Sequence, residues 1–244
     1  MKAIILAAGY ATRLQHLTHT TPKPLLPVNG SNVLEHIISK ISTIKDLNEI
    51  TIVSNQKFYQ QFVNWNNNYD SEIPINILND GSTTNDNRLG AIKDISFALE
   101  KEDNGNQYLV IAADNIIEHD FNKFYDEFKS NNYNLIAALD IKNKDLVRNK
   151  HGVVVLNENN KVIDFQEKPD VPRSTTKSIC CYLFQPGIKP LINQYLEENN
   201  PDATGFFIEW LHKQTEVHAH LFQGRVHDIG NPESYKQAQE LFKF

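Results

Sequence analysis

The chain has 244 residues, of which 40% are hydrophobic and 22% are charged, and its formal net charge at pH 7 is −6. These values are typical of a folded globular protein, and the negative charge argues against a general nucleic-acid binder, which needs a basic surface to replace counterions. The N-terminal run MKAIILAAG is too short for a signal peptide or a membrane span, and no later segment approaches ~20 uninterrupted apolar residues, so we expect a cytoplasmic protein without membrane contacts.

In the N-terminal half, short apolar runs alternate with helical patterns. The run Lys2–Ala7 is rich in Ile and predicts a buried parallel strand. Val33–Leu47 then predicts a helix with one apolar face, preceded by Asn32 as its N-cap. Later patterns predict, in order, a strand, a helix, a strand, a helix and a strand: Glu49–Ser54, Phe58–Trp65, Ile73–Leu78, Leu89–Leu99 and Gln107–Ala112.

The C-terminal half mixes helices and strands. A helix rich in aromatic residues is predicted from Phe121, and the polar stretch Asn157–Asn160 predicts a turn between two strands. The predicted strands are Leu135–Ile141, Gly152–Leu156, Lys161–Phe165, Ser178–Phe184 and Val217–Phe222. The predicted helices are Pro186–Leu196, a segment containing Phe207–Leu211, and Asn231–Phe242 with Pro232 in its first turn.

No repeat, low-complexity run or long linker divides the chain, so we predict a single domain over residues 1–244. Its expected fold class is α/β, with a Rossmann-like three-layer α/β/α arrangement and a mixed, mainly parallel central sheet. In such sheets, ligands bind beyond the carboxyl ends of the strands, and the loops there are the first places to look for chemistry.

The first of these loops is LAAGYATRL, residues 6–14. Ala7, Ala8 and Gly9 have little or no side chain, which lets a ligand approach the main chain, where exposed N–H groups can receive phosphate oxygens. Arg13 adds a positive fork suited to phosphate. Taken alone, an ordinary strand-to-loop turn explains the stretch better, because it matches neither the Walker A pattern nor G-x-G-x-x-G.

The segment TTPKPLLPVNG, residues 20–30, favours phosphate binding more strongly. Pro22 and Pro24 stiffen the chain on both sides of Lys23. A stiff loop that presents one lysine shortly after Arg13 is what a preorganised phosphate clamp needs. The alternative is a surface loop with a solvated lysine.

Together, LAAGYATRL and TPKPLLPV resemble the N-terminal signature of the sugar-1-phosphate nucleotidylyltransferases, or nucleotide-sugar pyrophosphorylases, in which LAAGxGTRLxPLTxxxPKPLxPV is usual. Later segments are similar to other elements of this family, in the same order: AADN (112–115), FQEKP (165–169), GFFIEWL (205–211) and DIGNPESY (228–235). The resemblance points to the glucose-1-phosphate thymidylyltransferase-like members, in a short form without a C-terminal β-helix domain.

The resemblance implies an enzyme that transfers a nucleotidyl group from an NTP to a sugar 1-phosphate and releases pyrophosphate. Glucose 1-phosphate with dTTP or UTP is the default pair of substrates. Nucleotide binding is expected mainly in residues 1–118 and sugar-phosphate binding mainly in residues 119–244. The attacking phosphate monoester is already anionic near neutral pH, because its second pKa is ~6, so alignment and charge neutralisation are the main tasks of the protein.

The resemblance also implies roles for the matching residues of the nucleotide site. Arg13 would hold the β- and γ-phosphates, and Lys23 would lie beside the α-phosphate, where charge develops. Asp114 and Asp228 would together hold Mg²⁺, a hard ion that also accepts phosphate oxygens and water, although each alone could be an ordinary turn or cap residue. The remaining residues expected to line the nucleotide are Leu6, Ala7, Ala8, Gly9, Thr84, Leu89 and Gly90.

In the sugar-phosphate site, the resemblance implies that Lys168 binds the incoming phosphate and that Glu167 accepts hydrogen bonds from sugar hydroxyls. The backbone of Gly152 would line the same site. Without the other motifs, Glu167 and Lys168 would be read as a charged pair at the end of a strand.

A few positions depart from the family pattern. Ala11 and Ala113 stand where Gly is usual, His16 stands where Pro is usual, and His151 replaces a usual Tyr. None of these changes removes a charged group from the expected mechanism. We expect the phosphate loop to tolerate Ala11, because an alanine would need only an ordinary φ there.

Other functions remain open from the sequence. A phosphocholine cytidylyltransferase is the nearest alternative, although a choline site favours an aromatic cage with acidic residues over the EKP element. A catalytically inactive nucleotide-sugar-binding regulatory protein would not need to retain all the charged residues above. An NAD-binding oxidoreductase lacks its glycine fingerprint after the first strand. The expected partners are small phosphorylated molecules and no nucleic acid, and a homo-oligomer is left open.

Overall fold

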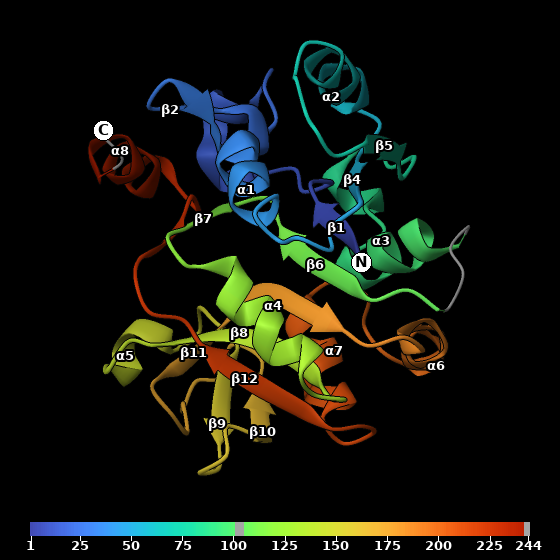
Figure 1. Ribbon diagram of the computed structural model, residues 1–244. Coiled ribbons are helices and arrows are strands. Elements are labelled where there is room, and N and C mark those ends of the chain that lie inside the picture. The colour runs from blue at the N-terminus through green and yellow to red at the C-terminus, as the bar shows by residue number, and fades with distance from the viewer. Residues whose placement is uncertain (101–104, 242–244) are drawn as a thin grey trace. The chain divides into compact units, whose positions relative to one another are not determined.

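Strands alternate with helices along the chain in the computed structural model of the protein (Figure 1). The structure describes residues 1–100 and 105–241, except for the side chains of Gln15 and His16. Two compact units can be distinguished: the first comprises residues 1–88, 112–122 and 224–244, and the second comprises residues 89–111 and 123–223. The predicted functional halves, divided after residue 118, concern ligand binding and stay a prediction.

A parallel sheet of three strands lies at the centre of the first unit. Its order is β1 (Lys2–Leu6), β4 (Glu49–Ser54) and β5 (Ile75–Asn79), and both pairings are parallel. Every residue of β4 from Ile50 to Ser54 is buried, as expected for a strand covered on both faces. Because the strands are parallel, the loops after β1 and β4 leave the same edge of the sheet.

Helix α1 (Val33–Ile41) begins at a capping box. The side chain of Asn32 accepts a hydrogen bond from Glu35 N at 2.9 Å, and Glu35 Oε2 accepts one from Asn32 N at 3.3 Å. The predicted N-cap is confirmed. The helix ends at Ile41 rather than Leu47, because the chain continues in turns in which Ile44 N donates to Ile41 O and Leu47 N to Ile44 O.

The rest of the first unit consists of short elements. Two antiparallel pairs are β2 (Pro27–Val28) with β3 (Ser31–Asn32) and β7 (Asn115–Ile117) with β13 (Val226–Asp228). The helices are α2 (Tyr59–Asn66) and α8 (Pro232–Leu241), with 3-10 helices η1 (Thr12–Thr18), η2 (Lys23–Leu25) and η3 (Asn85–Asn87). Figure 1 shows α8 beside the C-terminus. Along the chain, α8 follows β13.

Antiparallel pairing predominates in the second unit. The long strand β11 (Thr176–Phe184) pairs antiparallel with β6 (Tyr108–Ala112), β8 (Asn134–Asp140) and β9 (Val153–Leu156). Strand β10 (Val162–Gln166) continues antiparallel from β9, while β12 (Val217–Leu221) runs parallel to β8. The helices of this part of the chain are α3 (Ala91–Leu99), α4 (Phe121–Lys129), α5 (Lys144–Val147), α6 (Ile188–Glu198) and α7 (Thr204–Leu211).

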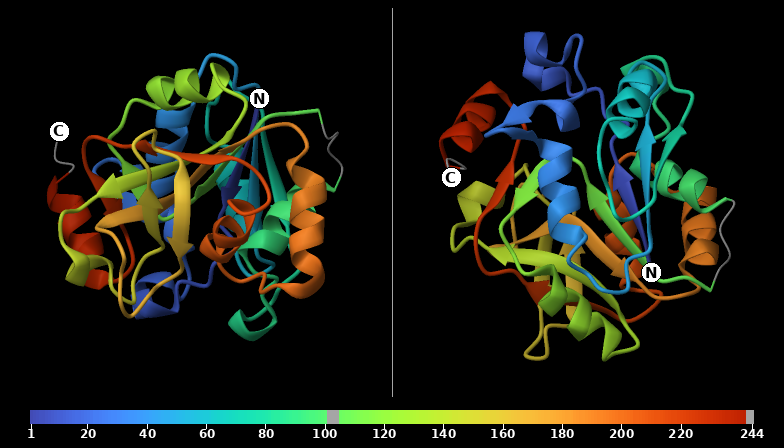
Figure 2. Two further views of the ribbon diagram at one scale, coloured as in Figure 1. Left: turned by 90° about the horizontal axis from the view of Figure 1, so that it is seen from below. Right: turned by 45° about the horizontal axis from the view of Figure 1, so that its top comes forward.

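Aromatic packing fixes α7 in the second unit. The ring of Phe207 is buried and meets Tyr195 of α6 edge-on, with the ring centroids 5.3 Å apart. It also meets Phe184 of β11 at 6.0 Å. Helices α6 and α7 accordingly lie next to each other in Figure 2. This packing holds the first turn of α7 in a defined place.

The predicted α/β class with a mixed sheet is confirmed, and its parallel pairing is concentrated in the first unit. Apart from the end of α1, the longer predicted elements are found within a few residues of their expected bounds, although Phe242 lies outside the described residues. Among the residues that the structure describes, no helix is both long and apolar enough to cross a membrane.

Candidate functional site

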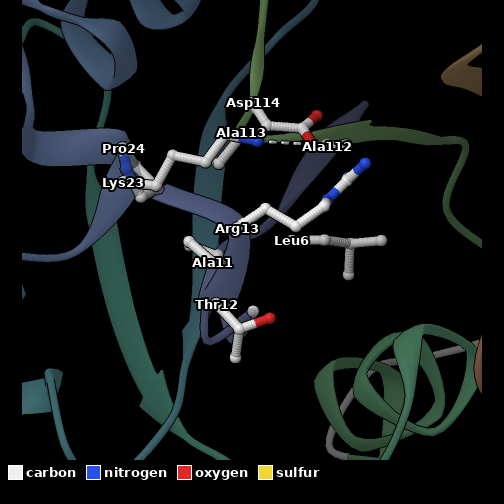
Figure 3. Close-up of a pocket in the computed structure, with 11 residues that line it drawn as sticks. Leu6, Ala11, Thr12, Arg13, Lys23, Pro24, Ala112, Ala113 and Asp114 are labelled. Atoms are coloured by element: carbon white, nitrogen blue, oxygen red, sulfur yellow. Dashed lines mark hydrogen bonds and ion pairs between the residues drawn. The ribbon is translucent and has the colours of Figure 1, made fainter. Parts of the chain in front are cut away.

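A cavity of ≈ 280 Å³ opens at the carboxyl end of β1 (Figure 3). All of its lining residues belong to the first unit. They are Leu6, Ala7, Gly9, Ala11, Thr12, Arg13, Lys23, Pro24, Ala112, Ala113 and Asp114. Most of the predicted nucleotide-site residues of this unit are therefore brought together here, whereas Ala8, in the same loop, is buried and is not in the lining.

The loop after β1 offers a row of backbone donors. Ala7 N still donates to Val53 O at 2.9 Å, and Leu14 N donates to Ala11 O at 3.0 Å. Between them, the N–H groups of residues 8–13 have no acceptor among the described residues. Such a run of unpaired N–H groups is suited to an anion, because each N–H carries a partial positive charge.

The side chain of Asn55 holds the start of this loop. It is fully buried, its Nδ2 donates to Ala8 O at 2.9 Å, and its Oδ1 accepts from Phe58 N at 3.0 Å. Since the peptide unit is planar and trans, fixing the Ala8 carbonyl toward Asn55 directs the N–H of Gly9 away from it. Sequence reasoning missed Asn55, although a polar residue directly after a buried strand was the available signal.

Ala11 adopts a left-handed conformation, with φ 47° and ψ 41°. The prediction of an ordinary φ is therefore wrong: the turn into η1 requires the region that glycine occupies without steric cost. For an alanine this conformation costs about 1–2 kcal/mol. The Ala11 carbonyl is held by Leu14 N and by the Thr18 hydroxyl, each at 3.0 Å, so local hydrogen bonds maintain the strained turn.

Arg13 follows this turn and has an exposed side chain that lines the cavity. Figure 3 shows its guanidinium and the Lys23 side chain extending toward the part of the cavity where Asp114 lies. Within the described ranges, Arg13 has no ion-pair partner. An unpaired guanidinium beside unpaired N–H groups is the arrangement expected of a phosphate site.

Lys23 lies between two carboxylates. Lys23 as a whole is only 9% exposed. Its Nζ is 3.0 Å from Asp114 Oδ2 and 4.0 Å from Asp228 Oδ1. The antiparallel pairing of β7 with β13 brings the two acids together, and Ile229 N donates to Asp114 O at 2.9 Å. The predicted meeting of Asp114 and Asp228 is thus present, with an ammonium group between them.

These carboxylates have the chemistry of a site for a hard dication. Their side chains are each 40% exposed, and Asn115 Nδ2 donates to Asp114 Oδ1 at 2.7 Å, which orients that carboxylate. No cluster of three or more Asp, Glu, His or Cys side chains able to hold a metal is found among the described residues. Two protein carboxylates fit Mg²⁺, which keeps water or phosphate oxygens in its other positions.

A second group of predicted residues lies in the second unit. Glu167 has a side chain only 7% exposed, and its Oε1 lies 3.5 Å from the Nζ of the exposed Lys168. Burial raises the pKa of Glu167, against the lowering effect of the Lys168 charge. Gly152 lies beside Glu167, so the three predicted sugar-phosphate residues are together.

The surroundings of this group are basic. Lys168 is in the left-handed region, with φ 46°, although Pro169 follows it, which is a strained conformation. Burial, with the charges of Lys177, Lys150 and Lys168, lowers the pKa of His151 to about 4. His151 is therefore neutral at physiological pH, and the positive charge near this group comes from the lysines.

The expected base-reading residues are divided between the two units. Thr84 is exposed at the start of η3, and its N–H donates to Asn87 Oδ1 at 2.9 Å. Gly90 has φ 92°, and a Cβ there would lie 2.7 Å from Pro201 O. Its backbone conformation and its packing therefore explain this glycine without a role in ligand binding. The role of Thr84, Leu89 and Gly90 in reading a base stays a prediction.

Comparison with known proteins agrees with this arrangement. A model of the family described as nucleotidyl transferase matches residues 2–243. The chain is 32% identical over 233 residues to the bifunctional protein GlmU of Methanocaldococcus jannaschii, covering 95% of this chain and 52% of that protein. It is 28% identical over 265 residues to the glucose-1-phosphate adenylyltransferase of Mycoplasma mobile, covering 98% and 66%. The chain thus spans about half the length of the GlmU relatives it matches.

The fold is also found among solved structures. The crystal structure of an apo UDP-glucose pyrophosphorylase superposes with a TM-score of 0.82, over 99% of this chain and 97% of that one. The sequence identity is 18%, so this likeness concerns the fold.

Proposed function

Because the chain belongs to the nucleotidyl transferase family, we propose that it transfers a nucleotidyl group from a nucleoside triphosphate to a sugar 1-phosphate and releases pyrophosphate. The observation that carries the proposal is the first-unit cavity, where Arg13 and the backbone N–H groups of Gly9, Ala11 and Thr12 lie with Lys23 and Asp114. Among the described residues, neither the Arg13 guanidinium nor these N–H groups have a partner. Glucose 1-phosphate with dTTP or UTP is the default pair. The partners are these small molecules, in the cytoplasm, and no nucleic acid.

Arg13 and the loop bind the triphosphate in this proposal. The guanidinium holds the β- and γ-phosphates, and the loop N–H groups, with Leu6, Ala7 and Gly9 around them, receive phosphate oxygens. An oxygen of the sugar 1-phosphate attacks the α-phosphorus, the bond from that phosphorus to the bridging oxygen breaks, and pyrophosphate leaves. The nucleophile is anionic near neutral pH, so no residue needs to remove a proton.

Lys23 neutralises charge at the α-phosphate. Its ammonium is already buried beside two carboxylates, so it is positioned before substrate binds. Asp114 and Asp228 would hold Mg²⁺, and the bound ion would supply positive charge that offsets the charge of the phosphates. Rigid placement matters here because the protein contributes orientation and electrostatics rather than a covalent step.

The acceptor is bound by the second group of residues. Lys168 is exposed and binds the acceptor phosphate, whereas the buried Glu167 accepts hydrogen bonds from sugar hydroxyls, next to the Gly152 backbone. The neutral His151 adds no charge to this group.

A substrate-panel assay tests the proposal. Folded protein with Mg²⁺ is incubated with each NTP and each of several sugar 1-phosphates, with phosphocholine and CTP as a further arm, and pyrophosphate is measured. Release with a sugar 1-phosphate supports the proposal. Absence of release with every pair refutes it, and release only with phosphocholine assigns the chain to the alternative enzyme.

The acceptor role of Lys168 has a matched control. Lys168→Ala should raise the KM for sugar 1-phosphate while the KM for NTP stays the same. Lys142 is also an exposed lysine with a left-handed φ, of 56°, and also pairs with an acid, Asp140. Lys142→Ala should leave both constants unchanged. An equal effect of Lys168→Ala on both substrates would contradict its assignment.

A further inference from the structure

Gly205, the second residue of α7, lies directly against the Glu167 carboxylate. A Cβ placed on Gly205 would collide with Glu167 Oε2 and lie 2.7 Å from Glu167 Cδ. The φ of Gly205 is not in the left-handed region, so the backbone itself would accept an alanine. Glycine is a poor helix former, and the need for space, not for an unusual φ, explains it here.

Gly152 lies against the same carboxylate. A Cβ on Gly152 would lie 3.1 Å from Glu167 Oε2 and 2.6 Å from Phe165 Cζ. Two glycines from separate segments and the buried Phe165 ring therefore form a seat for one carboxylate. The Glu167 side chain is only 7% exposed, so its carboxylate is held mainly by these protein contacts and not by water.

The position of the seat matters for Lys168 as well. Glu167 is followed at once by Lys168 in its strained left-handed conformation, and the two side chains form an ion pair. A carboxylate pushed out of the seat would no longer keep its present distance from the Lys168 ammonium group. The ion pair between the two side chains that we assign to the acceptor would then have a different geometry.

We propose that Gly205 is a positioning residue of the acceptor site: its missing side chain lets the first turn of α7 seat the Glu167 carboxylate. The kinetic consequence rests on the proposed function, since it assumes that Glu167 meets the sugar. The structural consequence does not, because the collision exists whatever the chain catalyses.

The structural part is tested by unfolding. Gly205→Ala should lower the Tm of the wild-type chain and of the Glu167→Gln chain, whose side chain has nearly the same shape. In the Glu167→Ala chain the collision with Glu167 is gone and only an approach of 3.3 Å to Phe165 Cε1 remains. Gly205→Ala should there raise the Tm by up to about 2–4 °C, because alanine favours a helix. A fall of the same size in all three backgrounds would overturn the proposal.

The functional part is tested by kinetics. Gly205→Ala should raise the KM for sugar 1-phosphate by about tenfold, the size expected when one positioned hydrogen bond is lost, with the KM for NTP unchanged. Phe206→Ala, at the exposed next residue of α7, is the control and should change neither constant. An equal rise in both KM values refutes the positioning role. If no substrate pair reacts at all, the proposed function fails, and the unfolding series still decides the role of Gly205.

Discussion

Lys23→Met removes the charge between Asp114 and Asp228 while keeping an unbranched side chain, one atom shorter than lysine. The ammonium lies 3.0 Å from one carboxylate and 4.0 Å from the other, and the lysine side chain is 11% exposed. At an effective dielectric constant of about 20, the nearer contact alone is worth ~5 kcal/mol before desolvation. Both acids are 40% exposed and water screens them, so we expect a net loss of about 1–2 kcal/mol in the free energy of unfolding.

Urea unfolding with and without Mg²⁺ measures this effect. Without its ammonium group, the acidic pair should bind the dication more tightly, so Mg²⁺ should stabilise Lys23→Met more than the wild type. Lys142→Met is the control: its lysine is 82% exposed and pairs with one acid, so the loss should stay below about 1 kcal/mol. A Lys23→Met protein as stable as the wild type, with the same response to Mg²⁺, would refute the reasoning.

Three further changes test the loop and the acceptor group. Ala11→Gly should raise the free energy of unfolding by about 0.5–1 kcal/mol, because relief of the left-handed strain exceeds the entropy that glycine adds to the unfolded chain; urea unfolding measures this, and a loss of stability would contradict the strain. Asn55→Asp keeps the acceptor for Phe58 N but places a carboxylate against the Ala8 carbonyl, which repels it. Steady-state kinetics should show a raised KM for NTP and an unchanged KM for sugar 1-phosphate. Equal changes in both KM values would argue against Asn55 as a loop anchor. The folded-state pKa of His151 is about 4, so between pH 6.5 and 4 only the unfolded chain gains this proton, and the free energy of unfolding falls as the pH falls. His151→Tyr does not titrate in this range and should lose less stability when unfolding is measured as a function of pH. Parallel curves for the two proteins would show that His151 does not contribute.

The sequence predicted those elements whose burial follows a regular pattern. Glu49–Ser54 is found with the predicted bounds, because a central parallel strand is apolar along its whole length. The three-residue strands β7 and β13 were missed, since elements of this length show no periodicity. Yet their pairing, with Asn115 opposite Asp228, is what brings the two acids together.

The candidate site was predictable in its charged residues and not in the residues that hold them. Arg13, Lys23 and Asp114 stand in recognisable motifs, and the structure places them around one cavity. Asn55 and Gly205 act through neighbours that are distant in sequence, Ala8 and Glu167. Their contributions depend on packing between separate elements, which a residue's own local pattern does not encode.

A strained backbone position occurs in each group of candidate site residues, the nucleotide group and the acceptor group. Outside glycine, a positive φ occurs at six described positions, and three of these are asparagines, which tolerate it well. Lys142, the fourth, is in a turn where its own N–H donates to Asp140 Oδ1 at 3.0 Å. The other two are Ala11, which starts the helix carrying Arg13, and Lys168, which follows Glu167.

Ala11 and Lys168 are thus the strained positions that are neither asparagines nor held in a turn by a neighbouring acidic side chain, as Asp140 holds Lys142. Each of these two residues positions a cation that we assign to a phosphate. Strain of this kind persists only where surrounding contacts over-determine the conformation. At Ala11 those contacts are the hydrogen bonds of its carbonyl to Leu14 N and to the Thr18 hydroxyl. At Lys168 the fixed neighbour is Glu167, enclosed by Gly152 and Gly205. Releasing Glu167 from its seat should therefore free Lys168 as well, so Gly205 bears on both halves of acceptor recognition.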